Sequence, residues 1–332
     1  MEYHSDNINF SIDDLIEELL DEDTPIHPTN LNNLSDLIGE DLVQFRKAWP
    51  NIPTWKKQAL LEDLEQLFED DTLLSFENVC RIALEDRNPQ IRFIALRCLQ
   101  EYDVKDLVLE FNRILNEDPD EEIRASAAST LGKYVYLGEL DSISKRKLKI
   151  IEDSLLRIIK SEDISLIQRH ALESLGFSSH NDVPELIKSA FDSNQIPWMI
   201  SALIAMGRSY DSRWEGKVKR AITHHSTDVR KEAIKTSGEL LLVNIRPILL
   251  KLLDDRDIEI RMAAVLALSM LGGSNTRVVL ENLLKHTSND EEIEIIENAI
   301  EKLVFNQSLG NLDFSDFDER PSLFDNNADD YV

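Results

Sequence analysis

The chain has 332 residues, 63 of them Asp or Glu and 36 Lys or Arg, which gives a formal net charge of −27. An acidic surface repels phosphate groups, so this charge disfavours nucleic acid as a general partner. No apolar run approaches the ~20 residues of a membrane span, and the acidic start lacks the basic and apolar regions of a signal peptide. We therefore expect a cytoplasmic protein that binds no membrane.

The first predicted helix spans residues 12–20, and Ser11 can cap its start. Its apolar side chains recur at the spacing of one helical face: Ile12, Leu15, Ile16, Leu19 and Leu20. Two roles are open for this helix. It packs on the end of the following array as a cap, or it is a tethered motif that docks on another protein. Residues 21–30 contain two prolines and predict a linker.

Helical hairpins are expected from there on. Residues 31–49 predict one helix, which Pro50 and Pro53 end, and the next helix starts at Thr54 and reaches about Phe68. An alanine then recurs on the apolar stripe of each second helix, in steps of 31 to 44 residues, at Ala59, Ala95, Ala127, Ala171, Ala202, Ala233, Ala264 and Ala299. Self-similarity with a period of 20–50 residues indicates a solenoid built from helix pairs.

A basic residue stands three positions before several of these alanines, and an acidic turn precedes it. The basic residues are Arg92, Arg124, Arg230 and Arg261, and the matching turn residues are Asp86, Asp118 and Asp255. The runs Asn88-Pro89-Gln90-Ile91-Arg92 and Asp118-Pro119-Asp120, with Ile123 and Arg124, resemble the HEAT-repeat family in its short form, the PBS-lyase-like HEAT repeats. The resemblance covers residues 53–305 and extends to uncharacterised bacterial HEAT-repeat proteins.

This resemblance implies an all-α fold, an α-solenoid that forms a right-handed superhelix of about seven or eight hairpins. It also implies that each Arg bonds the acidic turn of an adjacent hairpin, so that the seven residues named above form a structural ladder. Gln168, Met199 and Ile296 replace the basic residue in their hairpins and should interrupt the ladder.

Three regions are therefore expected. Residues 1–30 form an acidic N-terminal segment with a short amphipathic helix, residues 31–305 form the solenoid, and residues 306–332 form an acidic disordered tail. The tail carries seven acidic residues and one Arg among its apolar side chains, a composition typical of disordered segments that dock as short motifs.

The longest step between alanines, 44 residues, contains extra chain at residues 134–149. Its end holds the densest basic cluster of the sequence: Lys145, Arg146, Lys147 and Lys149. Insertions in repeat proteins fall in loops and often carry function. A functional insertion, a solvated loop and a lengthened helix start are all open for this stretch.

Residues 201–214 form the most individual stretch of the array. Trp, Tyr and Arg dominate binding hot spots, so we predict that a protein or peptide binds on the concave face around the fourth to sixth hairpins. The candidate contact residues are Arg169, Trp198, Arg208, Tyr210, Arg213 and Trp214. The alternative is that Trp214 packs in the core and that Arg208 and Arg213 pair with Asp211 and Glu215.

No motif of a known catalytic centre, phosphate-binding loop or metal site is present, so we expect no enzyme, no cofactor and no metal. Cys80 and Cys98 lie in apolar helical patterns and should be buried free thiols. The paired histidines His224 and His225 are poorly placed for chelation, because adjacent helical residues point apart.

The sequence thus predicts a non-enzymatic, monomeric scaffold or adaptor that binds an unidentified protein or peptide. A second hypothesis, from the resemblance, is an enzyme-associated subunit similar to bilin lyases, which would carry a coloured ligand. Nucleic-acid binding through the basic clusters is a third hypothesis, which the net charge disfavours.

Overall fold

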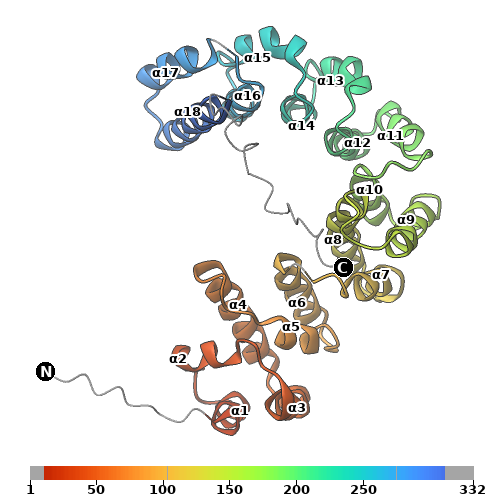
Figure 1. The fold of residues 1–332 in the computed structure, drawn as a ribbon, viewed down its shortest axis with the longest axis vertical. Helices are drawn as coiled ribbons and strands as arrows, with labels where there is room; N and C mark the ends of the chain where they lie inside the picture. Colours follow the sequence, from red (N-terminus) through yellow and green to blue (C-terminus); the bar gives the residue numbers. More distant parts are fainter. Residues whose placement is uncertain (1–10, 103, 274, 311–332) are drawn as a thin grey trace, which may run out of the picture. The chain divides into compact units, whose positions relative to one another are not determined.

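The computed structural model describes residues 11–102, 104–273 and 275–310 (Figure 1). All regular elements in these ranges are helices, and no strand occurs in them. Contacts divide the chain into two compact units, residues 1–209 and 210–332. None of the described helices combines the length and the apolar composition needed to cross a bilayer.

The first unit consists of helices α1 (Ile12–Leu20), α2 (Pro28–Leu31), α3 (Gly39–Ala48), α4 (Thr54–Asp70), α5 (Glu77–Ala83), α6 (Pro89–Glu101), α7 (Val108–Glu117), α8 (Glu121–Glu139), α9 (Lys145–Ile159), α10 (Ser165–Leu175), α11 (Val183–Asp192) and α12 (Ile196–Arg208). From α5 onward, each odd-numbered helix packs on the even-numbered helix that follows it. The second helices α4, α6, α8, α10 and α12 pack side by side in that order (Figure 1).

The second unit repeats this arrangement with α13 (Glu215–Ala221), α14 (Thr227–Glu239), α15 (Arg246–Leu252), α16 (Ile258–Leu271), α17 (Thr276–His286) and α18 (Asp290–Gly310). Helix α16 packs between α14 and α18. The alanines of the repeat column are buried from Ala95 to Ala299, where neighbouring helices meet. Only Ala59, near the start of the array, is partly exposed. The prediction of an all-α solenoid of helical hairpins is confirmed, and the handedness of its superhelix stays a prediction.

Helix α1 packs on its own chain, which favours the role of a cap. The hydroxyl of Ser11 accepts a hydrogen bond from the backbone N–H of Asp13 at 3.2 Å, as an N-cap residue does. Leu15 and Leu19 are fully buried where α1 packs against α3. Lys56 of α4 donates to the backbone carbonyl of Glu18 at the end of α1. The helix therefore closes the array at its N-terminal end.

The single helix expected over residues 31–49 is wrong. The chain forms α2, which already begins within the predicted linker, continues as a short 3-10 helix over Asn32–Leu34, and resumes an α-helix only at Gly39. Asp36 lies at a φ of 53° and Gly39 at 63°, so the backbone turns twice in the left-handed region. The N–H of Asp36 donates to the carbonyl of Ser75 at 2.7 Å, a contact with the next hairpin that local periodicity does not reveal.

The long step between alanines is built as helix rather than as a loop. Helix α8 continues to Glu139, and α9 begins at Lys145 with the Ser144 hydroxyl accepting from the N–H of Lys147 at 3.3 Å. The basic cluster therefore lies in the first turns of a lengthened helix, the third of the predicted alternatives. At the other end of the chain, α18 runs past the predicted boundary at residue 305, and residues 311–332 of the predicted tail lie outside the described residues.

Gly176 marks a close approach of α10 and α12. A Cβ atom there would lie 2.7 Å from both the Cα and the carbonyl oxygen of Ala205, which are backbone atoms of α12. We expect Gly176→Ala to force these helices apart and to lower the free energy of unfolding by about 1–3 kcal/mol. Gly216→Ala is the control, because a Cβ at this glycine of α13 meets no atom within 4 Å. Chemical denaturation of both variants checks the prediction, and equal stability of the two would contradict it.

Candidate protein-binding surface

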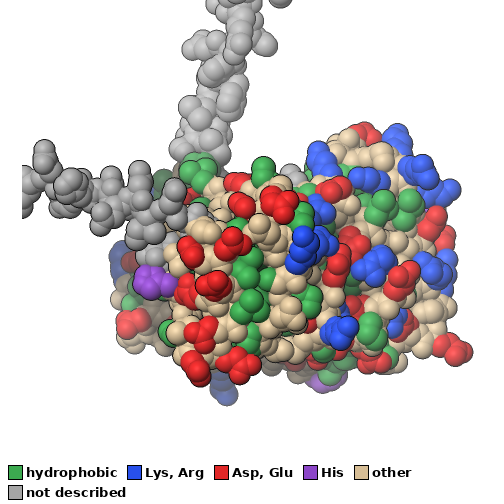
Figure 2. All heavy atoms as spheres, turned by 90° about the horizontal axis from the view of Figure 1, so that it is seen from below, with side chains coloured by type: hydrophobic (Ala, Val, Ile, Leu, Met, Phe, Trp, Pro, Cys, Tyr) green, Lys and Arg blue, Asp and Glu red, His purple; other side chains and the backbone are tan. Residues whose placement is uncertain are grey.

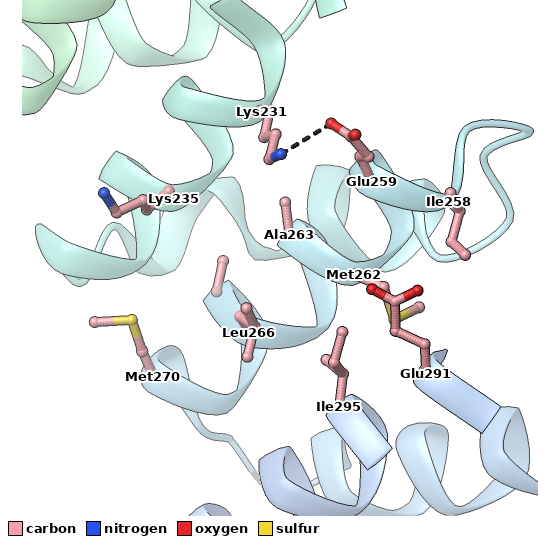
Figure 3. Close-up of a pocket in the computed structure, with 11 residues that line it drawn as sticks. Lys231, Lys235, Ile258, Glu259, Met262, Ala263, Leu266, Met270, Glu291 and Ile295 are labelled. Carbon is pink, nitrogen blue, oxygen red and sulfur yellow. Dashed lines mark hydrogen bonds and ion pairs between the residues drawn. The ribbon is translucent and has the colours of Figure 1, made fainter. Parts of the chain in front are cut away.

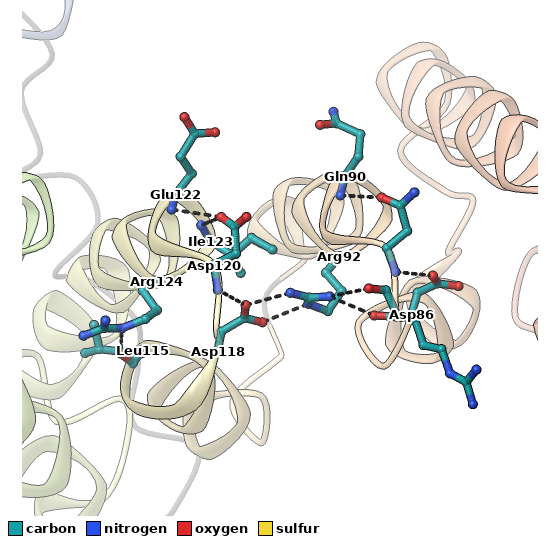
Figure 4. Close-up of polar contacts among 11 residues, drawn as sticks. Asp86, Gln90, Arg92, Leu115, Asp118, Asp120, Glu122, Ile123 and Arg124 are labelled. Atoms are coloured by element: carbon teal, nitrogen blue, oxygen red, sulfur yellow. Dashed lines mark hydrogen bonds and ion pairs between the residues drawn. The ribbon is translucent and has the colours of Figure 1, made fainter.

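Arg92 joins two successive hairpins of the first unit (Figure 4). Its guanidinium donates two hydrogen bonds to the Asp118 carboxylate, at 2.9 Å from Nε and 2.8 Å from Nη2. Its Nη1 donates to the carbonyl oxygens of Asp86 and Arg87, in the turn before α6. Only 12% of the Arg92 side chain and 8% of the Asp118 side chain are exposed. This bidentate ion pair fixes one hairpin to the next, as predicted for a ladder.

Asp86 forms the corresponding ion pair one hairpin earlier, with Lys57 of α4. The Lys57 ammonium donates to Oδ2 of Asp86 at 2.8 Å, and both side chains are 7% exposed. The indole N–H of Trp49 donates to the same oxygen at 2.9 Å. Burial alone would raise the pKa of Asp86, but these bonds and one from the N–H of Asn88 bring the pKa below its usual 3.8. The carboxylate is therefore ionised and fully bonded.

Arg124 and Arg261 also form ion pairs that connect successive hairpins, but with acids that the sequence analysis did not select. Arg124 pairs with Asp163, which follows α9. Arg261 pairs with Glu292, in the first turn of α18. The prediction that the Asp255 carboxylate takes part in the ladder is wrong, because Asp255 offers only its backbone carbonyl, to Arg261 of its own hairpin.

Arg230 does not extend the ladder. It donates to the carbonyl oxygens of His224 and His225 in its own hairpin, and within the described ranges it forms no ion pair with Asp255. The predicted pairing of Arg230 with an acidic turn is therefore wrong. Gln168 donates its amide to the carbonyl of Ser161 at 2.7 Å, so the predicted interruption occurs there.

A groove crosses the second helices of the second unit (Figure 3). It has a volume of about 430 Å³ and is lined from α14, α16 and α18. Its floor is apolar, and its central side chain, Leu266, is 49% exposed. The lining residues of this groove are Lys231, Lys235, Ile258, Glu259, Met262, Ala263, Leu266, Ala267, Met270, Glu291 and Ile295.

The rim of this groove is charged on both sides. On the α14 side, Lys231 pairs with Glu259 of α16 at 2.8 Å, and both side chains are more than half exposed (Figure 3). Lys235 contacts Glu232 and Glu239 of its own helix at 3.5 and 3.8 Å. Exposed pairs of this kind stabilise a protein by less than about 1 kcal/mol, so an incoming charged group can replace them at little cost.

The three predicted contact residues of the first unit do not form one patch. Trp198 and Arg208 lie at opposite ends of α12, roughly 15 Å apart along its axis at 1.5 Å per residue. Arg208 lies over the ring of Phe177, 5.1 Å from its centroid. Arg169 of α10 is partly exposed, and its Nε is buried without a hydrogen-bond partner in the described part of the chain.

Of the three predicted contact residues in the second unit, only Tyr210 remains a candidate, because it is 70% exposed. Arg213 pairs with Asp211, as the alternative interpretation expected. Glu215 accepts from the amide of Asn244 instead of from an arginine. Trp214 is buried, with 5% of its surface exposed, so its prediction as a contact residue is wrong and its core role is correct.

A family model described as HEAT repeats matches residues 215–301. This segment carries HEAT repeats. The groove helices α14 and α16 lie wholly within this HEAT segment, and α18 begins in it. The resemblance seen in the sequence is confirmed over these residues.

Several solved structures are similar to the chain in fold. YibA of Escherichia coli is 16% identical, with a TM-score of 0.43 over 86% of this chain and 98% of that one. The complex of CpcE and CpcF of phycocyanin lyase from Nostoc sp. PCC7120 is 17% identical, with a TM-score of 0.45 over 68% and 94%. Human deoxyhypusine hydroxylase is 16% identical, with a TM-score of 0.35 over 89% and 96%. No curated protein matches the chain in sequence.

Sequence reasoning missed the groove of the HEAT segment, although a signal was present. Met262, Leu266 and Met270 recur at intervals of four residues, which places them on one face of α16. This stripe differs from the one that carries Ala264, so α16 is apolar on two faces. Helix α16 packs against α14, α15 and α18, yet Leu266 in this second stripe remains 49% exposed, and the stripe therefore indicates a surface that is left for another partner.

A polar network joins three second helices of the first unit. The hydroxyl of Ser129 lies 2.8 Å from Nδ1 of His170, and Oε2 of Glu173 lies 3.4 Å from the same nitrogen. Burial raises the pKa of Glu173, but bonds from His170 and Ser201 bring it below its usual 4.5. A catalytic relay needs the hydroxyl and the carboxylate on opposite ring nitrogens. The arrangement therefore serves to connect α8, α10 and α12.

The two cysteines are buried free thiols, as predicted. A bond with the Cys98 thiol, together with burial, raises the pKa of Cys80 well above its usual value, so the nucleophilic thiolate is disfavoured. Within the described ranges, no three His, Cys, Asp or Glu side chains gather as a metal site would require.

On the face drawn in Figure 2, Asp and Glu side chains lie between and beside the Lys and Arg side chains.

Proposed function

We propose that the protein is a non-enzymatic interaction scaffold, which binds an amphipathic segment of a partner protein in the groove of α14, α16 and α18. The single observation that carries the proposal is the exposed apolar floor at Leu266. Grooves between packed helices accept the apolar face of a partner helix, with anchors spaced by three or four residues. The spacing of Met262, Leu266 and Met270 suits such a segment.

The charges at the rim define the chemistry of the partner. Lys231 and Lys235 line the α14 side, so the segment should carry an acidic edge next to its apolar stripe. The net charge of −27 supports a protein rather than a nucleic acid as partner. We propose that the scaffold acts as a cytoplasmic monomer.

The test compares three full-length baits in affinity capture from the protein's own cells: wild type, Leu266→Glu and Val278→Glu. Val278 of α17 is 54% exposed and lies outside the groove, so its variant adds the same charge to an exposed apolar site. We expect a partner that binds wild type and Val278→Glu, and whose retention falls about tenfold or more with Leu266→Glu. The purified partner should also shift the methyl signals of Met262 and Met270.

A partner that binds all three baits equally would contradict the proposed groove. Copurification of a coloured ligand would favour the bilin-lyase-like alternative, and loss of binding at moderate salt with nucleic acid in the eluate would favour the nucleic-acid alternative.

A further inference from the structure

We propose that residues 312–319 of this same chain dock in the groove of α14, α16 and α18 and compete there with the partner. The inference rests on the groove put forward above as a binding surface, but it needs no partner to be tested. The segment reads Leu-Asp-Phe-Ser-Asp-Phe-Asp-Glu. It contains three apolar residues and four acids but no basic residue. An acidic segment with apolar anchors is the kind of partner proposed above for this groove.

Charge complementarity is the first support. Lys231 and Lys235 stand along the α14 side of the floor. Lys302 follows Ile295 by seven residues, which is two turns along the same face of α18, and it is exposed. The repeat column makes Lys235 level with Leu266, so Lys235 and Lys302 stand on the two sides of the apolar floor near Leu266, whereas the lining acids Glu259 and Glu291 lie in the first turns of α16 and α18. Asp316 between the two phenylalanines, Phe314 and Phe317, and Asp313 and Asp318 beside them can meet these basic side chains.

Reach is the second support. The repeat column aligns Ala299 of α18 with Ala264 of α16, so Leu266 is level with residue 301. Helix α18 ends at Gly310, about 14 Å further along its axis at 1.5 Å per residue. Neighbouring helix axes lie roughly 8–10 Å apart. A chain that turns back from Gly310 must therefore cover roughly 17 Å, and residues 311–317 can span about 23 Å when extended.

The match of anchors is the third support. If the returning segment runs antiparallel to α18 in a polyproline II conformation, residues three positions apart lie on one face, so Phe314 can face Met270 and Phe317 can face Leu266. Both floor side chains are accessible: Leu266 is 49% exposed and Met270 is partly exposed. Thioether side chains make favourable contacts with aromatic rings. The tail therefore supplies one aromatic side chain for each open position of the floor.

The experiment uses methyl-labelled methionine in the full-length chain. The five methionines are Met1, Met199, Met206, Met262 and Met270, and only the last two line the groove. A spin label is attached at Ser322→Cys, where it leaves Phe314 and Phe317 free, while the native thiols Cys80 and Cys98 are buried. We expect the label to broaden the signals of Met262 and Met270 more than those of Met199 and Met206.

Two variants make the result specific. Phe314→Ala with Phe317→Ala should abolish the selective broadening, and Leu266→Glu should do the same from the groove side. Broadening that is equal for all four internal methionines, or that survives the loss of both phenylalanines, would overturn the inference. If the tail fills the groove in about nine molecules of ten, the double phenylalanine variant should bind the partner about tenfold more tightly.

The outcomes separate the two proposals. If a partner shifts Met262 and Met270 but the spin label does not broaden them selectively, the tail does not dock and the scaffold function stands. If the label broadens them and no partner depends on Leu266, the tail docks and the proposed function fails.

Discussion

Asp86→Ala is expected to lower the free energy of unfolding of the first unit by about 3–5 kcal/mol, the cost of removing one partner of a buried ion pair. The Asp86 carboxylate accepts from Lys57, Trp49 and the N–H of Asn88. Its loss leaves a buried ammonium group without a counter-charge, since the Lys57 side chain is only 7% exposed. Hydrogen exchange at α4 and α6, together with chemical denaturation, measures the effect.

Asp255→Ala is the matched control, because Asp255 holds the same place in a turn of the second unit. Its carboxylate accepts from the N–H of Asp257 at 2.9 Å, and within the described ranges it pairs with no cation. We expect its loss to cost about 1 kcal/mol. Equal destabilisation by the two variants would show that the turn matters and that the ion pair does not.

The pH dependence of this difference follows from the pKa of Asp86, which the folded protein lowers below 3.8. A carboxylate with a lowered pKa contributes stability above its unfolded pKa and loses this contribution as the pH falls through the folded value. The gap between wild type and Asp86→Ala should therefore persist from neutral pH to about pH 4 and narrow below it.

Trp214→Ala is expected to lower the stability of the second unit by about 3–5 kcal/mol, as loss of a large buried side chain does. Only 5% of Trp214 is exposed, at the start of α13. Truncation would leave a cavity beside that helix. Hydrogen exchange resolved to residues 210–310 should show the loss, since a two-unit chain need not unfold in a single step.

Trp55→Ala is the control for this variant, because Trp55 also lies near the start of a helix but is 51% exposed. Its loss should change stability by roughly 0.5 kcal/mol. A Trp214→Ala protein with native exchange rates and lost partner binding would contradict the core assignment. In the expected case, Trp214 is unsuitable as a probe of binding, and Leu266 is the residue to change.

The sequence predicted the repeat because one small residue per helix suffices to mark it. Ala95, Ala171 and Ala264 are fully buried where second helices meet, and their spacing does not depend on which residues cover the surface of the repeat. The joints were harder to predict. Arg92 and Asp118 stand in the expected positions, whereas Arg261 takes its acid from a helix. An ion pair depends on side-chain reach, and several nearby acids satisfy the same spacing.

The contact residues could not be predicted from composition. Trp214 and Tyr210 have the same statistical preference for interfaces, yet one is buried and the other is 70% exposed. They are four positions apart, and the backbone of Tyr210 lies at a φ of 50°, which turns the chain between them. Leu266 was overlooked because a leucine in a helix is usually expected in the core, whereas this one is 49% exposed. The stripe of residues spaced by four was the better guide.

The lengthened connection between α8 and α9, which belong to two successive hairpins, has a consequence for the history of the array. Arg124 at the start of α8 still reaches Asp163 after α9, although the alanine step there is the longest in the chain. The additional residues lie at the opposite end, where α8 ends and α9 begins. The connection between two hairpins can therefore grow at one end of these helices while the ion pair of Arg124 and Asp163 at the other end is preserved. Insertions can therefore accumulate there during evolution, and a designer could insert new sequence at residues 140–142, before the buried Ile143 and the Ser144 cap, without disturbing the neighbouring repeat.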